Sequence, residues 1–253
     1  VLFNERVRIN QANITDQELI DSFTNISVIL KANQIELTFF EFITLSAWQI
    51  FSQKNLDILL LEIGLGGRLD AVNAIPKDLA IITSVDYDHQ EYLGNDLETI
   101  GFEKAGIITD CKPVIYGDDF MPKIISEIAK ERNSELHKFG HDYNLILQDN
   151  NLIFENRATK INLELEQVSH SIRLNNIATS LKALSIYLEL NNSKLGNVLD
   201  IVKDKINNLS VTGRCSWLDK NKTITLSPQV YQYFTISNTD QITVDINVQG
   251  GVA

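Results

Sequence analysis

Two continuous apolar runs constrain the fold of this chain more than any other feature. Residues 56–63, LDILLLEI, and residues 79–85, LAIITSV, each have the length of a strand and few polar positions. Apolar runs without alternation suit strands that are covered on both faces, as in a parallel sheet between helices. Residues 112–117 and 135–139 continue the pattern more weakly. Together these runs predict the strands of one buried sheet.

Stretches with helical periodicity separate or precede these runs. Residues 96–107 and 119–132 lie between the later runs, and residues 16–33 and 38–53 precede the first. Thr38 and Glu41 have the spacing of a capping box, which predicts a helix start there. Alternation of strands and helices predicts an α/β fold with a doubly wound, mainly parallel sheet.

The pattern changes in the second half of the chain. Residues 141–168 alternate apolar and polar positions around Asp149-Asn150-Asn151, which predicts a hairpin or a small antiparallel subsheet. Helices are predicted again over 173–191 and 194–208. After Gly213-Arg214 the composition shifts to Thr, Asn, Gln and Ser. We therefore expect one domain over 1–210 and, over 211–253, part of a second, C-terminal α/β domain.

Composition and charge exclude several classes of protein. The 253 residues carry a formal net charge of −11, whereas nucleic-acid and acidic-membrane binders need a basic face. No apolar run approaches the ~18 residues that suggest a membrane span, and no signal peptide is visible. Cys111 and Cys215 lie far apart, which favours free thiols in a reducing cytoplasm. Because the first residue is valine, we expect the sequence to belong to a longer protein.

Polar residues follow the first two apolar runs. Glu62 ends the first run and precedes a turn with Gly64, Gly66 and Gly67, and His89 lies just past the end of the second. In open α/β sheets, ligands bind at the carboxyl ends of the strands. A carboxylate oxygen and an imidazole nitrogen can both bind a divalent cation, and glycines allow a tight turn with close approach of the backbone.

Each of these features alone has a simpler explanation. Glu62 can be an ordinary strand end, and His89 can be a loop or core histidine. The GLGG segment can be only a turn, since it does not match the G-x-G-x-x-G dinucleotide pattern. FEKAGI, residues 102–107, can be a helix end with Gly106 as its cap. Only the occurrence of all four features in one chain indicates a ligand-binding site.

Taken together, these blocks resemble the folylpolyglutamate synthase and dihydrofolate synthase family, relatives of the Mur peptide ligases. FNERVRIN resembles the segment after the family's folate-binding loop, and TFFEFIT its next helix. EIGLGGRLDAVN and ITSVDYDHQEYLGNDLETIGFEKAGII resemble its two most distinctive motifs. LNNIATSLKAL and VTGRCSW resemble its adenine-side helix and interdomain arginine segment. The resemblance extends to about residue 226 and implies a Mur-ligase-like central ATPase domain.

The resemblance implies an ATP-dependent carboxylate–amine ligase. In the family, ATP phosphorylates a carboxylate of folate or dihydropteroate, and L-glutamate then attacks the acyl phosphate. By motif match, Glu62 and His89 would be catalytic magnesium ligands. Lys104 would be the catalytic lysine that carbon dioxide carbamylates, and its carbamate would coordinate or orient the second of two Mg²⁺ ions.

The same match assigns the substrate side of the site. Arg68, Asp70 and Ala71 would bind the folate substrate, with Asp70 facing the pterin; the alternative for Asp70 is a turn residue that bonds its own backbone. Asn176 would lie near the adenine of ATP, and Arg214 would reach its phosphates. If Asp70 faces the pterin, we expect both folate activities, dihydrofolate synthase and folylpolyglutamate synthase. We also expect a cytoplasmic monomer that binds neither nucleic acid nor membrane.

Some family features are missing from the sequence. No G-x-x-x-x-G-K-[ST] phosphate loop occurs, and the family has one upstream of FNER. The family's ribose-contacting Asp-x-x-His-Asn segment does not follow Leu226, and Asp86 replaces a residue that is usually small. We expect further segments to complete the protein. The alternatives are a Mur-type ligase for a cell-wall precursor and a non-catalytic α/β binding module that lacks the phosphate loop.

Overall fold

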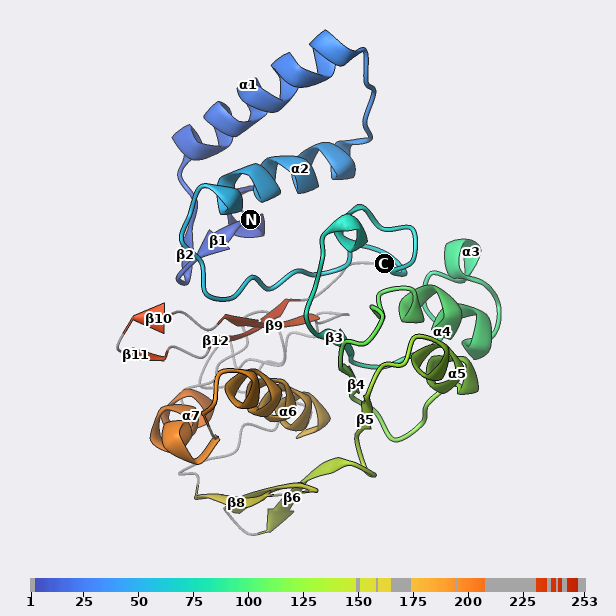
Figure 1. Cartoon of the computed structure of the whole chain (residues 1–253), viewed down its shortest axis with the longest axis vertical. Helices are drawn as coiled ribbons and strands as arrows, with labels where there is room; N and C mark the ends of the chain where they lie inside the picture. The colour runs from blue at the N-terminus through green and yellow to red at the C-terminus, as the bar shows by residue number, and fades with distance from the viewer. Residues whose placement is uncertain are drawn as a thin grey trace, which may run out of the picture.

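A three-stranded parallel sheet organises the fold of the computed structural model (Figure 1). The structure describes residues 3–148, 151–157, 159–164, 174–193 and 195–207, together with the backbone of four later strands. The sheet has the order β3 (Ala80–Ile82), β4 (Val114–Tyr116), β5 (Leu136–Lys138), with Ile81 paired to Ile115 and Ile115 to His137. Three of the predicted strands are therefore confirmed.

Helices cover both faces of this sheet, as a doubly wound fold requires. The short helix α3 (Gln90–Leu93) precedes α4 (Leu97–Ala105), and α5 (Lys123–Glu131) follows β4. Val114 and Tyr116 have no exposed surface and pack in one core with α4 and α5, whereas Ile115 points the other way, into the core with α6 (Leu174–Leu190). This separation follows from the two-residue period of a strand.

The predicted antiparallel subsheet is present. Strands β6 (Tyr143–Gln148), β7 (Asn151–Asn156) and β8 (Thr159–Glu164) form it in that order, and Gln148 pairs with Asn151 across the predicted hairpin. Leu152 and Phe154 are fully buried against α6, so α6 lies between the two sheets (Figure 1). A 3-10 turn (Leu195–Val198) and α7 (Leu199–Asn207) complete this core.

The N-terminal segment forms a helical pair with a small core of its own. It contains a 3-10 turn (Phe3–Arg6), β1 (Arg8–Ile9), β2 (Ala12–Asn13), α1 (Asp16–Asn33) and α2 (Phe39–Ser52). Both helices begin with complete capping boxes, Thr15 with Glu18 and Thr38 with Glu41. The second confirms the predicted capping box, because each side chain satisfies a backbone N–H that the helix leaves free.

The prediction of a strand over 56–63 is wrong. This segment leads from α2 toward the sheet as coil (Figure 1), and it has no ladder hydrogen bonds to β3 or to any other described strand. Most of its residues are half-buried. An apolar run reports that a segment is covered, but it does not specify a pairing partner.

The end of the chain contains four short strands. Strand β9 (Tyr231–Thr235) pairs antiparallel with β12 (Asp245–Gln249), and β10 (Asn238–Thr239) pairs with β11 (Gln241–Ile242). The predicted domain boundary near residue 210 lies outside the described residues. No helix in the described part of the chain is long and apolar enough to cross a membrane.

Candidate functional site

His89 lies in the loop that follows β3, at the carboxyl edge of the sheet. It is the N-cap of α3 and has a left-handed backbone, with φ of 49°. Its backbone N–H donates to Asp88 Oδ1 at 2.9 Å, and Asp88 Oδ2 lies 3.7 Å from His89 Nε2. Asp88 therefore holds His89 from two sides. Sequence reasoning missed Asp88, although an acid directly before the predicted histidine ligand was a usable signal.

Lys104 lies in the last turn of α4, near the same loop. Burial lowers the pKa of its ammonium, and the negative charge of Asp88 acts in the opposite direction. Asp88 thus contacts His89 and also acts electrostatically on Lys104, the second of two predicted site residues. A lysine with a lowered pKa has a larger fraction of neutral, nucleophilic amine.

Glu62 is a half-buried carboxylate without a partner among the described residues. Burial raises its pKa to about 8, and its oxygens make no hydrogen bond or ion pair with any described residue. An isolated buried charge is costly unless a counter-charge accompanies it. This carboxylate fits a divalent cation, which takes oxygen ligands. No group of three or more His, Cys, Asp or Glu within the described ranges forms a complete metal site. A cation held by Glu62 and His89 would have few protein ligands, which leaves coordination positions for phosphate oxygens and water.

The glycine loop between Glu62 and the 3-10 turn Ala71–Ala74 lies against the end of α4. Gly67 has φ of 154°, and a Cβ there would lie 2.9 Å from the carbonyl oxygen of Glu103. The next residue, Arg68, donates its backbone N–H to that same oxygen at 2.8 Å. Glycine is needed at position 67 because backbone meets backbone at this point.

The side chain of Arg68 also contacts α4. Its Nε and one terminal nitrogen donate to Glu103 Oε1 at 3.1 and 2.9 Å, and its guanidinium lies over the ring of Phe102, 5.4 Å from the centroid. The folate contact expected of Arg68 stays a prediction. The contacts in the structure are those of a residue that joins the loop to the helix.

Asp70 closes the glycine loop. Its Oδ2 accepts the backbone N–H groups of Gly64 at 2.9 Å and Leu65 at 3.0 Å, and its Oδ1 accepts that of Val72 at 2.9 Å. These bonds match the alternative of a turn residue that bonds its own backbone. The pterin contact of Asp70 and the substrate contact of Ala71, the first residue of the 3-10 turn, stay predictions.

Asn176 lies in the first turn of α6, near the carboxyl end of β4. Its neighbour Asn175 donates to Asp118 Oδ1 at 3.3 Å, and a Cβ on Gly117 would lie 2.5 Å from Thr179 Oγ1. Because β3 and β4 are parallel, this is the sheet edge at which His89 also lies. The adenine contact of Asn176 stays a prediction, and Arg214 lies outside the described residues.

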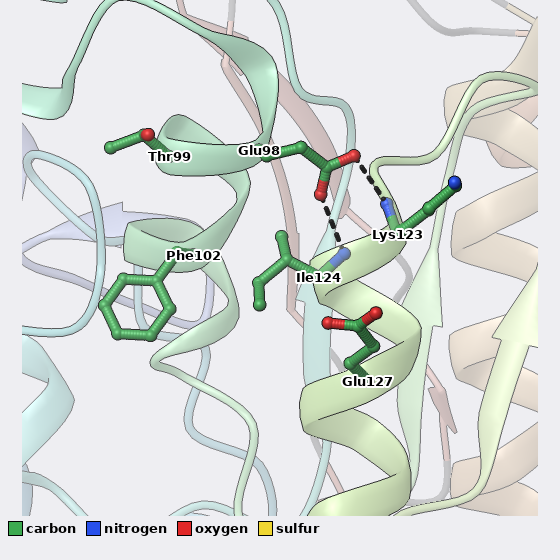
Figure 2. Close-up of a pocket in the computed structure, with 6 residues that line it drawn as sticks. All are labelled: Glu98, Thr99, Phe102, Lys123, Ile124 and Glu127. Carbon is green, nitrogen blue, oxygen red and sulfur yellow. Dashed lines mark hydrogen bonds between the residues drawn. The ribbon is translucent and has the colours of Figure 1, made fainter.

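A pocket of about 560 Å³ between α4 and α5 is a separate feature (Figure 2). None of the predicted site residues lines it. The side chain of Glu98 reaches from α4 to the start of α5, where it accepts the backbone N–H groups of Lys123 and Ile124, both at 2.9 Å. This carboxylate caps α5, whose N-cap Pro122 makes no side-chain bond. The pocket is lined by Glu98, Thr99, Phe102, Lys123, Ile124 and Glu127.

The fold and the residues at the sheet edge define a class of protein. Residues 12–183 match the Mur ligase middle domain, and the chain belongs to this family. Within it, the chain is similar to dihydrofolate synthase/folylpolyglutamate synthase of Escherichia coli K12, with 40% identity over 185 residues that make up 73% of this chain and 42% of that protein.

Solved structures agree with this relationship. One is E. coli FolC in complex with DHPP and ADP, with a TM-score of 0.79 and 32% identity, covering 90% of this chain and 53% of that one. Another is a bifunctional folylpolyglutamate synthase/dihydrofolate synthase with Mn, AMPPNP and L-glutamate bound, with a TM-score of 0.73 and 35% identity over 87% and 51% of the two chains. The chain thus spans about half the length of these relatives or less.

Proposed function

We propose that this chain is the central ATP-handling part of a ligase that adds L-glutamate to folates and to dihydropteroate through an acyl phosphate. The observation that carries the proposal is the half-buried Glu62, which has no partner among the described residues, in a chain where Asp88 contacts His89 and acts electrostatically on Lys104. The similar solved proteins bind ADP or AMPPNP, Mn and L-glutamate, which supports ATP, a divalent cation and glutamate here.

Two Mg²⁺ ions are the proposed cations. Glu62 would supply an oxygen ligand and His89 a nitrogen ligand, and Asp88 would fix the orientation of the imidazole. A bound cation supplies charge that stabilises the phosphoryl group during its transfer. The contribution of this chain is to hold His89 at the carboxyl end of β3, where a nucleotide can approach, and to present Glu62 from the coil that precedes the glycine loop.

Lys104 is the proposed site of carbamylation. The neutral Nζ would attack the carbon of carbon dioxide, forming an N–C bond while one proton leaves to solvent. The product is an anion with two oxygens, which suits a site that binds the second cation. The lowered pKa of Lys104 supports this step, because only the neutral amine is nucleophilic.

The remaining assignments complete the proposal. Arg68, Asp70 and Ala71 would lie on the folate side, Asn176 near adenine, and Arg214 near the phosphates. We propose a monomer in the cytoplasm, and the exposed free thiol of Cys111 is consistent with a reducing compartment.

The test is a substrate comparison with the natural full-length protein. We expect release of ADP that depends on Mg²⁺ and L-glutamate with dihydropteroate and with tetrahydrofolate, and formation of the glutamylated products by mass spectrometry. Asp70→Ala should weaken use of dihydropteroate by about tenfold, because pterin donors left unpaired cost about 1–3 kcal/mol each, and should affect tetrahydrofolate less. Equal losses on both substrates would reject the pterin role of Asp70. Nucleotide binding without turnover would favour the non-catalytic module, and turnover of a cell-wall precursor the Mur-type alternative.

A further inference from the structure

Asn73 joins two segments that are more than thirty residues apart in the sequence. Its Nδ2 donates to the carbonyl oxygen of Arg68 at 3.2 Å and to that of Gly106 at 3.1 Å. The first carbonyl belongs to the glycine loop, and the second is at the end of α4. One amide group therefore uses both of its N–H donors to hold the loop against the helix.

The carboxamide oxygen of Asn73 shows that this arrangement has a cost. Oδ1 is buried and has no hydrogen-bond partner among the described residues. An unsatisfied buried acceptor costs about 1–3 kcal/mol. The orientation of the amide is nevertheless fixed, because two carbonyl oxygens can accept only from the nitrogen.

Gly106 is the counterpart of Asn73 on the helix. Its φ of −57° is ordinary for any residue, so it is not needed as a left-handed helix cap. A Cβ at this position would instead lie 2.3 Å from Arg68 Cβ and 2.4 Å from Arg68 Cα. The glycine is required because the loop backbone and the helix end are in direct contact.

A partly exposed ion pair of Arg68 with Glu103 also joins the glycine loop to α4. We call Arg68, Asn73, Glu103 and Gly106 the loop–helix clamp. Glu62 lies two residues before the glycine loop, and Lys104 lies between the two helix members of the clamp. The clamp therefore ties the loop that follows Glu62 to the helix end that carries Lys104.

We propose that Asn73 is a positioning residue that, through the loop–helix clamp, sets the separation of Glu62 and Lys104. This inference rests on the proposed function. Asn73 itself does not touch substrate or cation. It acts by keeping two charged groups from different segments at the spacing that the reaction requires. A misplacement of about 1 Å costs about 100-fold in rate.

The decisive variant is Asn73→Asp in the full-length protein. It preserves the shape of the side chain but places a carboxylate oxygen against two carbonyl oxygens. We expect kcat to fall about 100-fold, while KM for ATP stays within threefold of wild type. We also expect the Kd for Mn²⁺ in the presence of ADP, measured by electron paramagnetic resonance, to rise about tenfold. The matched control is Asn25→Asp, at an exposed position of α1, which should match wild type in all three measurements.

A second pair of variants separates positioning from a general loss of folding. Gly106→Ala should displace the loop and reproduce the losses in kcat and Mn²⁺ affinity, whereas Gly196→Ala, whose Cβ would meet nothing within 4 Å, should have neither effect. Variants that melt at a lower temperature but keep wild-type kcat and Mn²⁺ affinity would overturn the positioning role. An inactive wild type would instead overturn the proposed function, and this inference with it.

Discussion

Two carboxylates in this protein, one buried and one half-buried, are desolvated with opposite results. Asp142, at the turn between β5 and β6, is 6% exposed and accepts hydrogen bonds from the backbone of Lys138 at 2.8 Å, from His141 at 3.0 Å and from Arg157. Glu62, before the glycine loop, has no partner among the described residues. Burial raises the pKa of both, but the three donors bring the pKa of Asp142 below its ordinary value.

The difference separates a carboxylate whose charge is used within the fold from one for which we propose a ligand. The partners of Asp142 join β5, β6 and the end of β7, so its negative charge is used within the fold. The negative charge of Glu62 is not used within the described fold. A desolvated acid without a hydrogen-bond or ion-pair partner is a candidate functional group, because no contact within the fold offsets the cost of its desolvation.

The largest expected effect is on the activity of Glu62→Gln. The amide preserves size but removes the charge that a cation needs. We expect kcat to fall by about 100- to 1,000-fold, the range for loss of a group that stabilises transition-state charge. The melting temperature in EDTA should stay equal or rise, because a buried ionisable group is removed. Steady-state kinetics at saturating Mg²⁺ and thermal denaturation measure the two effects; wild-type turnover would refute the metal-ligand assignment.

Lys104→Ala tests the proposed carbamylation site. We expect a loss of about 100-fold in kcat, with partial recovery when a small carboxylic acid is added to replace the carbamate. In the wild type, ¹³C-bicarbonate should give a carbamate resonance that is absent from the variant. Full activity of the variant in buffer free of carbon dioxide would contradict the assignment and leave Lys104 as an ordinary helix-end lysine.

Asp142→Asn should lower the stability of the protein and leave its activity unchanged, the reverse of Glu62→Gln. The replacement removes the charge and exchanges one acceptor oxygen for an NH2 group, so at least one of the three donors loses its acceptor. We expect a loss of about 1–3 kcal/mol in the free energy of unfolding, with kcat close to wild type. Urea denaturation provides the measurement. The control is Asp78→Asn, since Asp78 forms an exposed ion pair with Lys112 at 2.7 Å and such pairs contribute only about 0–1 kcal/mol. Equal losses in the free energy of unfolding for Asp142→Asn and Asp78→Asn would contradict the structural role of Asp142.

The last prediction concerns the pH dependence of stability without divalent cations. The pKa of Glu62 is raised from 4.5 to about 8, so the folded state binds the additional proton between these values and its stability falls as pH rises through this window. The slope is at most about 1.4 kcal/mol per pH unit. The pKa of Asp142 is lowered, so its contribution is present above the unfolded pKa and is lost as pH falls through the lower, folded pKa.

Two variants separate these slopes in denaturation curves measured across pH in EDTA. Glu62→Gln should flatten the curve between pH 5 and 8, and Asp142→Asn should flatten its acid end. The groups that face Asp142 are His141 and Arg157 on its own side of the subsheet and Lys182 on α6. An unchanged slope in Glu62→Gln would show that Glu62 is ionised in the folded protein at neutral pH.

Sequence reasoning succeeded where neighbouring residues determine the outcome. The capping box at Thr38 and Glu41 and the apolar runs that became β3 and β4 are local patterns, and the structure confirms them. The predicted strand over 56–63 failed because its pairing depends on a partner that the run does not encode. The roles that the motifs assign to Lys104 and His89 stay predictions.

The missing parts are contacts between distant segments. Asn73 reaches Gly106 across thirty-three positions, and Arg157 reaches Asp142 across fifteen, with no spacing rule that would announce either pair. For Asp70 the sequence left a pterin contact and a turn role open; its oxygens bind three backbone N–H groups that only the turned loop brings together, and the pterin contact stays a prediction. A side chain's type limits what it can bond, whereas the fold decides which bond forms.

The cap that Glu98 supplies to α5 has a consequence for the order of folding. A helix leaves its first backbone N–H groups without partners, and here two of them are satisfied by a residue of α4 (Figure 2). The first turn of α5 is therefore complete only after α4 has formed and docked. The amide hydrogens of Lys123 and Ile124 become reporters of that docking: their exchange with deuterium should accelerate whenever α4, and Lys104 with it, leaves its place.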